Sequence, residues 1–187
     1  MLKQILWHGR GGEGAFTAAK VLAAAWALKE GRYALAFPSF GPERRGAPVR
    51  AFTRISDSAV GDRSEITRAD IVIWLDPTLA GAVKPELELT EGGIALVNRK
   101  EWSDLKNAAD PERVINFDAS GLALKILGRP IANTVLSGAV AALSGGFDEE
   151  DLKAGIKAVM KPSLVSKNES AAIEAFRFIN GLKRRIA

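Results

Sequence analysis

Apolar residues recur along the chain in two patterns, short runs typical of strands and longer spans with helical spacing. Six segments are predicted to be strands, and in the fourth the run "ADIVIWL" is continuous enough for a covered strand. The predicted strands are residues 5–8, 33–37, 49–55, 69–75, 93–98 and 113–117. The predicted helices are residues 15–30, 119–127, 133–143, 149–160 and 167–182.

The order of these elements predicts the fold class. Strands alternate with helical segments up to residue 118, and the remainder is helical. We therefore expect an α/β fold with three layers, a mostly parallel sheet, helices on both faces and a helical C-terminal stretch. Apolar and polar residues alternate over residues 49–55, which predicts a half-exposed strand. No repeat or low-complexity linker interrupts the pattern, so residues 1–187 are expected to form one domain.

Charge and hydropathy limit the classes of partner. The chain has 26 Lys and Arg against 22 Asp and Glu, and both signs are dispersed. A nucleic-acid binder usually carries a concentrated basic stripe, so we expect no nucleic-acid partner. The longest apolar run, residues 21–28, is far shorter than the roughly 20 residues that span a bilayer. With no secretory signal pattern at the start, we expect a cytoplasmic protein without a membrane partner.

The chain has no cysteine and a single histidine, which restricts metal chemistry. Thiolate zinc sites and cysteine-ligated iron–sulfur clusters need cysteines, so this chain cannot supply their ligands. His8 alone cannot form a multi-histidine site, and no nucleophile–base pair accompanies it. We interpret His8 as a packed side chain, with a general base as the alternative.

A glycine-rich segment, "HGRGGEG", follows the first predicted strand and precedes the first predicted helix. Gly9, Gly11 and Gly14 have the spacing of a dinucleotide-binding loop, in which helix amides hold a diphosphate. An NAD site also needs an acid near the end of the second strand, but position 34 is alanine and no acid precedes Glu43. Autonomous NAD binding is therefore disfavoured. Two interpretations stay open: an anion site, or a tight strand-to-helix turn.

A second segment, "FPSFGPERRGAP" at residues 37–48, is rich in proline and glycine. The adjacent Arg44 and Arg45 are suited to bidentate contacts with phosphate or carboxylate. Ligands bind at the carboxyl edge of an open α/β sheet, where we expect this segment to lie beside the glycine-rich segment. The alternative is an exposed loop with solvated charges.

Four motifs together resemble the gamma subunits of the 2-oxoacid:ferredoxin oxidoreductases, closest in form to the pyruvate and ketoisovalerate type. They are "GRGGEGAFTAAKVLA", "FPSFGPERRGAPVRAFTRI", "DPTL" and "NTVLSGA", spread over residues 5–143. This chain has Glu13 where glutamine is expected in many members. That substitution puts a negative charge beside the expected anion site.

The resemblance implies a subunit of an enzyme that decarboxylates a 2-oxoacid, here pyruvate, to an acyl-coenzyme A and passes electrons to ferredoxin. The isolated chain would be inactive, with no catalytic or metal-binding residue and no cofactor held alone. Thiamine diphosphate, Mg and 4Fe-4S clusters would belong to alpha, beta and delta-type partner subunits. Ferredoxin would be met through the complex, and this chain would contact coenzyme A.

By the same resemblance, three groups of residues would contact coenzyme A or a partner surface. They are the glycines Gly9, Gly11, Gly12 and Gly14; the loop residues Ser39, Phe40, Gly41, Pro42, Glu43, Arg44, Arg45 and Gly46; and the helix-opening pair Asn133 and Thr134. For Asn133 and Thr134, a polar helix cap is the alternative. Two other functions remain: a stand-alone nucleotide-binding oxidoreductase, and a purely structural subunit whose loops serve only assembly.

Overall fold

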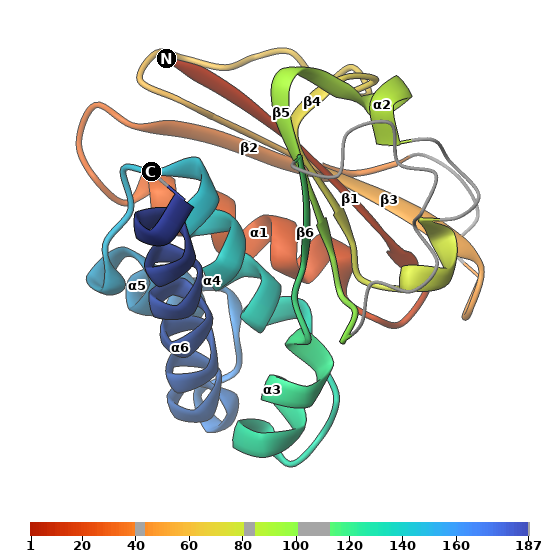
Figure 1. The fold of residues 1–187 in the computed structure, drawn as a ribbon. Helices are drawn as coiled ribbons and strands as arrows, with labels where there is room; N and C mark the ends of the chain where they lie inside the picture. The colour runs from red at the N-terminus through yellow and green to blue at the C-terminus, as the bar shows by residue number, and fades with distance from the viewer. Residues whose placement is uncertain (40–43, 81–84, 101–112, 187) are drawn as a thin grey trace.

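The computed structural model describes residues 1–39, 44–80, 85–100 and 113–186 and shows one mixed sheet with helices packed against it (Figure 1). The sheet has six strands in the order β2-β3-β1-β4-β5-β6. The strands are β1 Leu2–Arg10, β2 Tyr33–Pro38, β3 Pro48–Ser56, β4 Ala69–Trp74, β5 Leu89–Val97 and β6 Val114–Asn116. All six predicted strands are present.

Strand direction decides which loops share an edge of the sheet. β1, β4, β5 and β6 form parallel pairs, whereas β3 is antiparallel to both β1 and β2. β2 therefore runs in the same direction as β1. The segment that enters β3 lies at the edge where β1, β2 and β4 end, and the mostly parallel α/β sheet is confirmed.

The five predicted helices are present, and a short helix, α2, was not predicted. The helices are α1 Ala15–Ala27, α2 Pro85–Glu88, α3 Ala119–Leu127, α4 Asn133–Ser144, α5 Glu149–Val159 and α6 Pro162–Ile186, with a 3₁₀ turn η1 at Pro77–Leu79. α6 begins earlier than residue 167 because Pro162 occupies its first position, where proline is well tolerated. Within the described ranges, no helix is long and apolar enough to cross a bilayer.

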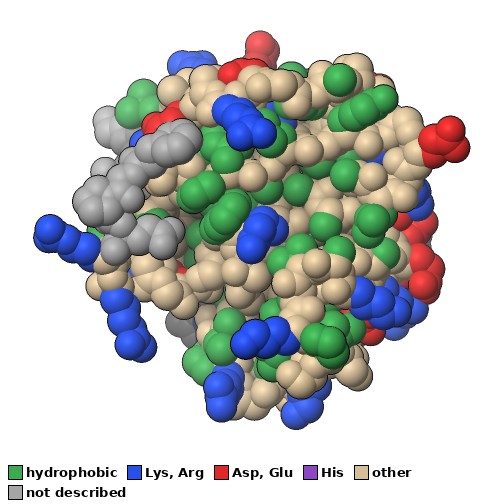
Figure 2. Space-filling model, turned by 180° about the vertical axis from the view of Figure 1, so that it is seen from behind, with side chains coloured by type: hydrophobic (Ala, Val, Ile, Leu, Met, Phe, Trp, Pro, Cys, Tyr) green, Lys and Arg blue, Asp and Glu red, His purple; other side chains and the backbone are tan. Residues whose placement is uncertain are grey.

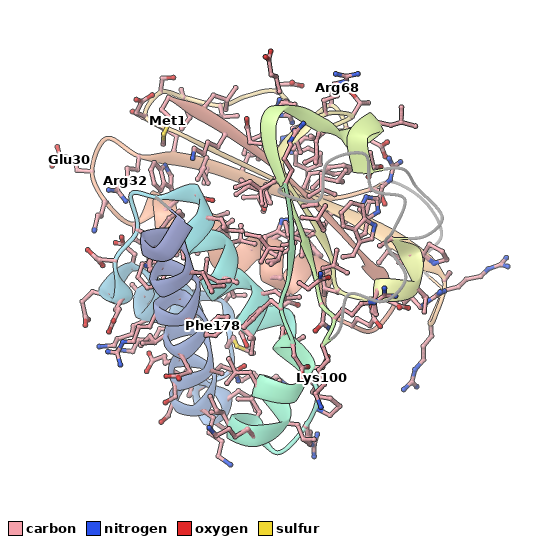
Figure 3. All side chains as sticks on the ribbon, viewed as in Figure 1. Met1, Glu30, Arg32, Arg68, Lys100 and Phe178 are labelled. Atoms are coloured by element: carbon pink, nitrogen blue, oxygen red, sulfur yellow. The ribbon has the colours of Figure 1, made fainter. Side chains whose placement is uncertain are left out.

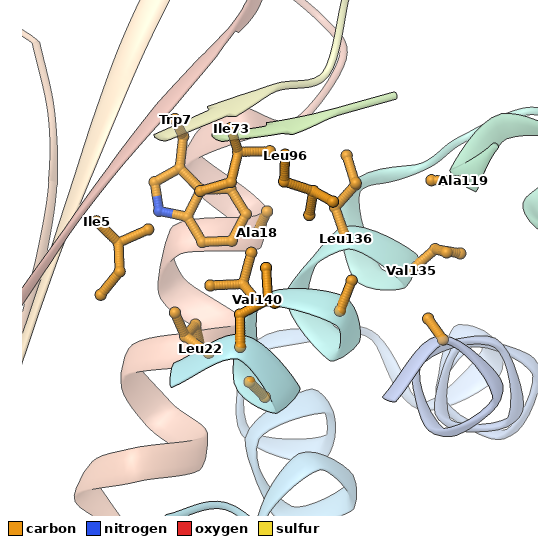
Figure 4. Packing of buried hydrophobic residues seen from close by; sticks show 14 of the residues in the cluster. Ile5, Trp7, Ala18, Leu22, Ile73, Leu96, Ala119, Val135, Leu136 and Val140 are labelled. Carbon is orange, nitrogen blue, oxygen red and sulfur yellow. The ribbon is translucent and has the colours of Figure 1, made fainter. Parts of the chain in front are cut away.

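One face of the sheet packs against α1 and α4 and forms the larger core (Figure 4). Trp7 and Ile73 project from the strands towards Ala18 of α1 and Leu136 of α4, and all four are fully buried. The Trp7 indole donates to Thr53 Oγ1 at 3.0 Å, so the polar atom of this ring is satisfied inside the core.

Two glycines allow helices to pack unusually close together. A Cβ added at Gly138 of α4 would lie 2.0 Å from the Ala172 carbonyl oxygen of α6. One added at Gly155 of α5 would lie 2.6 Å from the Ala25 amide nitrogen of α1. Every residue of α4 is buried, so this helix is the centre of the helical layer.

The second face of the sheet has a thinner cover than the sequence predicts. A second core, including Leu6, Phe52 and Trp74, lies there. Among the described residues, only the four-residue α2 and the turn η1 supply helical structure on this side. Helices on both faces are thus present, but the second helical layer is reduced to these short pieces.

Strand β3 is interior, which corrects the prediction of a half-exposed strand. Its residues from Ala51 to Ser56 are buried, and Arg54 is only 3% exposed. The Arg54 guanidinium donates to the carbonyl oxygens of Asp62 and Ser64 at 2.7 and 2.9 Å. The alternating pattern misled because this arginine faces a covering loop instead of solvent.

Candidate functional site at the carboxyl edge of the sheet

The glycine loop, residues 9–14, connects β1 to α1. Gly12 and Gly14 have positive φ angles of 99° and 85°, which glycine adopts without a Cβ penalty. Gly14 is the N-cap of α1 and makes no side-chain cap bond, so no side chain here competes for the first-turn amides. Gly9 lies inside β1, paired with Val49, where a Cβ would be 3.3 Å from that of Ala15. Gly9 therefore serves close strand–helix packing.

The arginine segment, residues 44–47, lies directly against the glycine loop. The Gly11 amide donates to the Ala47 carbonyl oxygen at 2.9 Å, and the Gly46 amide donates to the Gly11 carbonyl oxygen at 3.0 Å. A Cβ at Gly11 would be 2.3 Å from the Arg44 carbonyl oxygen. The two motifs that the sequence predicts to meet are thus joined through their backbones.

Arg10 ties a third loop to these two. Its Nε donates to Asp76 Oδ2, its Nη2 to Thr78 Oγ1 at 2.9 Å, and its Nη1 to the Gly46 carbonyl oxygen at 3.1 Å. Asp76 and Thr78 belong to the "DPTL" motif, so three quoted motifs meet here. The glycine loop, the arginine segment and residues 76–78 are called the rim below. The role of Arg10 was not predicted, since its only signal was its place among the glycines.

Asp76 is held in its charged form by this network. Burial raises the pKa of the Asp76 carboxyl, but hydrogen bonds from the Thr78 hydroxyl and amide and from Arg10 outweigh burial. The net result is a pKa below the ordinary value of 3.8. Because the folded pKa is depressed, Asp76 contributes stability above its unfolded pKa and loses it as pH falls through the folded pKa.

An Asp76→Asn variant is expected to lose about 1–2 kcal/mol of unfolding free energy at pH 7, because the charged cap and the Arg10 contact are lost. The gap to the wild type should narrow as pH falls below the unfolded pKa of about 3.9 and towards the lowered folded pKa, because the unfolded wild-type chain takes up the proton first. Urea unfolding at pH 7 and pH 3 measures both effects. A gap that stays constant with pH would contradict a charged Asp76 as the source of the stability.

Arg44 and Arg45 present free cations at the rim. Both side chains are exposed, and neither guanidinium has a hydrogen-bond or ion-pair partner among the residues that the structure describes. Beside them, a cavity of about 330 Å³ lies between the glycine loop, the first turn of α1 and the β2–β3 ends. Phe16, Thr17 and Arg50 are among its lining residues. Cationic forks, free helix amides and a cavity together suit a phosphate-bearing ligand.

Glu13 lies on the other side of the glycine loop. Its Oε2 accepts the Arg10 amide at 2.7 Å. It lines a different cavity of about 230 Å³, together with Asn98 and Ser120 near the ends of β5 and the start of α3. The carboxylate therefore faces the β4–β5 side, whereas the arginine segment adjoins the β2–β3 side, so its charge is not beside the arginines.

The helix-opening pair separates into two different environments. Asn133 packs against the glycine loop, where its Nδ2 lies 2.4 Å from the position of a Cβ on Gly14. Thr134 is fully buried and donates to Asn168 Oδ1 of α6 at 2.6 Å, so it does not reach the rim. Neither side chain caps α4, whose N-cap is Ala132.

Of the remaining predicted residues, the structure describes Ser39. The Ser39 amide donates to the Arg50 carbonyl oxygen at 2.9 Å, continuing the β2–β3 pairing towards the rim. Phe40, Gly41, Pro42 and Glu43 lie outside the described residues.

His8 lies away from the rim, on the second face of the sheet. Its ring stacks on Trp74 with centroids 5.2 Å apart, and its Nε2 lies 2.7 Å from Glu88 Oε2. The side chain is buried, as expected for a packed histidine. Across the described part of the chain, no group of three or more metal-ligating side chains comes together.

Comparison with known proteins gives a consistent result. The profile of the family described as "Pyruvate ferredoxin/flavodoxin oxidoreductase" matches residues 4–178. The chain is 46% identical over 176 residues to the pyruvate/ketoisovalerate oxidoreductases common subunit gamma of Thermococcus kodakarensis, covering 92% of this chain and 95% of that protein. It is 42% identical to the pyruvate synthase subunit PorC of Methanothermobacter thermautotrophicus, covering 96% and 97% of the two chains.

A solved structure agrees with the sequence relatives. The crystal structure of pyruvate oxidoreductase subunit PORC from Thermotoga maritima superimposes with a TM-score of 0.74 at 32% identity, covering 94% of this chain and 96% of the other. These relatives match the chain along nearly its whole length, and the matched part includes the six-stranded sheet and the rim motifs. The chain belongs to the pyruvate ferredoxin/flavodoxin oxidoreductase family.

Proposed function

We propose that this chain is the gamma subunit of a multi-subunit 2-oxoacid:ferredoxin oxidoreductase, and that its rim helps to bind coenzyme A at a junction with partner subunits. The named relatives are subunits of pyruvate or pyruvate/ketoisovalerate enzymes, which supports pyruvate or a branched 2-oxoacid as the substrate of the whole enzyme. In this proposal the chain acts in the cytoplasm, as one domain over residues 1–187.

The cofactors are proposed to lie on other subunits. Iron–sulfur clusters are held by cysteine thiolates, and this chain has no cysteine, so its donor set does not fit such a cluster. We assign thiamine diphosphate, Mg and 4Fe-4S clusters to alpha, beta and delta-type partners, and contact with ferredoxin to the complex. In this proposal the chain contributes a binding surface to the enzyme and no ligand to its cofactors.

One observation carries the coenzyme A part of the proposal: the backbone junction of Gly11 with residues 45–47 holds the segment that carries two exposed arginines against the glycine loop, which leads into the uncapped start of α1. Coenzyme A carries a diphosphate and a ribose phosphate, which guanidinium forks and helix amides recognise. Because the rim is rigidly joined, little ordering is needed when the ligand binds.

One face of the molecule is poor in acidic side chains. On the face seen from behind in Figure 2, hydrophobic side chains and Lys or Arg side chains are scattered over the centre, while Asp and Glu side chains lie towards the margins. In our proposal this face is available to a partner subunit.

A stand-alone nucleotide-binding oxidoreductase fits the geometry less well. β2 ends with Phe37 and Pro38, and Ala34 lies inside the strand, so this strand offers no acid for a ribose. The purely structural subunit differs from our proposal in one measurable respect, the response of coenzyme A kinetics to changes at the rim.

We expect an Arg44→Ala, Arg45→Ala double variant in the assembled enzyme to raise the KM for coenzyme A about tenfold, because charge-assisted contacts to phosphate are lost. Thiamine-dependent decarboxylation of the 2-oxoacid without coenzyme A should continue at the wild-type rate. Steady-state kinetics of the purified complex, with its subunits identified by mass, measures both quantities.

The matched control is Arg63→Ala with Arg68→Ala, which removes the same charge from two other exposed arginines. Arg68 precedes β4, whereas rim residues 76–78 follow the end of this strand, so Arg68 lies at the opposite edge of the sheet from the rim; it is labelled in Figure 3. An unchanged KM for coenzyme A in fully assembled rim variant would reject the coenzyme-facing rim. Loss of assembly with an unchanged KM in the remaining complex would favour the structural subunit.

A further inference from the structure

A third cavity lies where three helices begin and two end, and the proposed function does not use it. It has a volume of about 550 Å³ and is called the helix-start pocket. Thr17 comes from the first turn of α1, Asn133 opens α4, and Leu164 lies in the first turn of α6. Among the described residues it shares only Thr17 with the cavity at the arginine segment.

The charged side chains of the pocket are all basic. The helices α1, α4 and α6 begin here, whereas α3 ends at the lining residue Leu127 and α5 is capped by Met160, so the helix dipoles offset one another and the charge comes from side chains. Arg129 and Lys167 line the pocket, both are exposed, and neither has an ion-pair partner in the part of the chain that is described. No carboxylate is among the lining residues. Glu169, one residue beyond the lining residue Asn168, faces α5 and Lys157 instead.

Two polar side chains at the pocket wall have a donor without a partner among the described residues. Asn133 is only 7% exposed, and its Oδ1 accepts the Thr134 amide at 2.8 Å. Its Nδ2 makes no hydrogen bond to any described residue, nor does the Thr17 hydroxyl. Because both residues line the cavity, these donors can bond an acceptor that enters it.

The rest of the wall is apolar. Leu127 and Met160 line the pocket, and Ile131 and Leu164, which are 46% and 48% exposed, carry its apolar surface out to solvent. A site with an apolar wall, a few polar donors and this volume is typical of small-molecule pockets. The mixture selects a ligand that has both a charge and a hydrocarbon portion.

We propose that the helix-start pocket binds a small organic anion with a short aliphatic chain. Its carboxylate or phosphate is held by Arg129, Lys167 and the Asn133 amide, and its chain packs on Ile131 and Leu164. The pocket adjoins the rim through Thr17 and Asn133, but Arg129 and Lys167 are not part of the rim, so the proposal can be tested without coenzyme A.

Hexanoate and its uncharged match hexanamide are the probes, titrated into the full chain in chloride buffer and followed by calorimetry or ligand-observed NMR. We expect hexanoate to bind at least tenfold more tightly than hexanamide. An Arg129→Gln, Lys167→Gln double variant should lose at least tenfold in hexanoate affinity. Arg63→Gln with Arg68→Gln, and Arg44→Gln with Arg45→Gln, should bind hexanoate like the wild type.

The contributions of the basic side chains and of the apolar wall to hexanoate binding are tested separately. Inorganic phosphate should compete with hexanoate, and Leu164→Ser at the exposed mouth should weaken hexanoate while leaving phosphate unchanged. Equal binding of hexanoate and hexanamide, no binding at millimolar probe, or unchanged affinity in the folded Arg129→Gln, Lys167→Gln variant each overturns the proposal. If that variant fails to fold, the Leu164→Ser comparison decides.

Discussion

A Gly138→Ala variant is expected to lose about 3 kcal/mol or more of unfolding free energy, the upper part of the range for overpacked cores. The added methyl would lie 2.0 Å from the Ala172 carbonyl oxygen and 2.7 Å from its carbonyl carbon. Both are backbone atoms of α6, so no side chain can turn aside. Because α4 is buried throughout, relief requires α6 to move as a whole away from the core.

Gly181→Ala is the matched control, since it makes the same chemical change on α6 with no atom within 4 Å of the new methyl. Alanine is the better helix former, so this control should gain about 0.5–1 kcal/mol. Urea unfolding, with midpoints compared at equal slope, measures both variants. A Gly138→Ala protein as stable as the wild type would show that α4 and α6 do not pack as closely as described.

Much of the sheet could be predicted because local pattern and strand length are enough to recognise it. Continuous apolar runs such as residues 69–75 must be covered on both faces, and β4 is. The meeting of the glycine loop and the arginine segment also followed from sequence. One motif comes after a strand and the other lies between two strands, which brings both to the carboxyl edge of the sheet.

The hydrogen-bond partners of the long polar side chains could not be predicted from the sequence. Arg54 looked solvent-exposed by alternation, but it is buried against carbonyl oxygens of the loop that follows β3, 8 and 10 positions further along the chain. Arg10 looked like a loop residue, yet it fixes Asp76 and Thr78, which are 66 and 68 positions away. Such contacts depend on tertiary geometry, and the residue types alone give no signal for them.

The sequence predicted which motifs form the candidate site, and the structure shows what the individual residues of these motifs contact. Gly11 and Gly14 are needed for close approach, to Arg44 and Asn133 respectively, whereas Gly9 packs within a strand. Thr134, adjacent to Asn133 in sequence, faces α6 because successive helix residues point about 100° apart. The helix-start pocket could not be foreseen, since its lining comes from helices far apart in the sequence.

A Gly11→Ala variant is expected to separate the two loops of the rim without removing any charge. Its methyl would lie 2.3 Å from the Arg44 carbonyl oxygen, so the backbone of one loop must move. The paired bonds between Gly11 and residues 46 and 47 should then weaken, with a loss of about 2 kcal/mol of unfolding free energy. Hydrogen exchange at the Gly11 and Gly46 amides measures the junction directly, and both should exchange faster than in the wild type.

Two controls separate geometry from charge. Gly61→Ala places a methyl in open space at a glycine without positive φ, so stability and exchange should stay unchanged. Arg44→Ala with Arg45→Ala should keep the two amides protected, because the junction is made by backbone atoms. If the coenzyme A site is the rim that we propose, Gly11→Ala in the assembled enzyme raises the KM for coenzyme A although both arginines remain. Wild-type amide protection in Gly11→Ala would mean that the close approach at this residue does not hold the rim together.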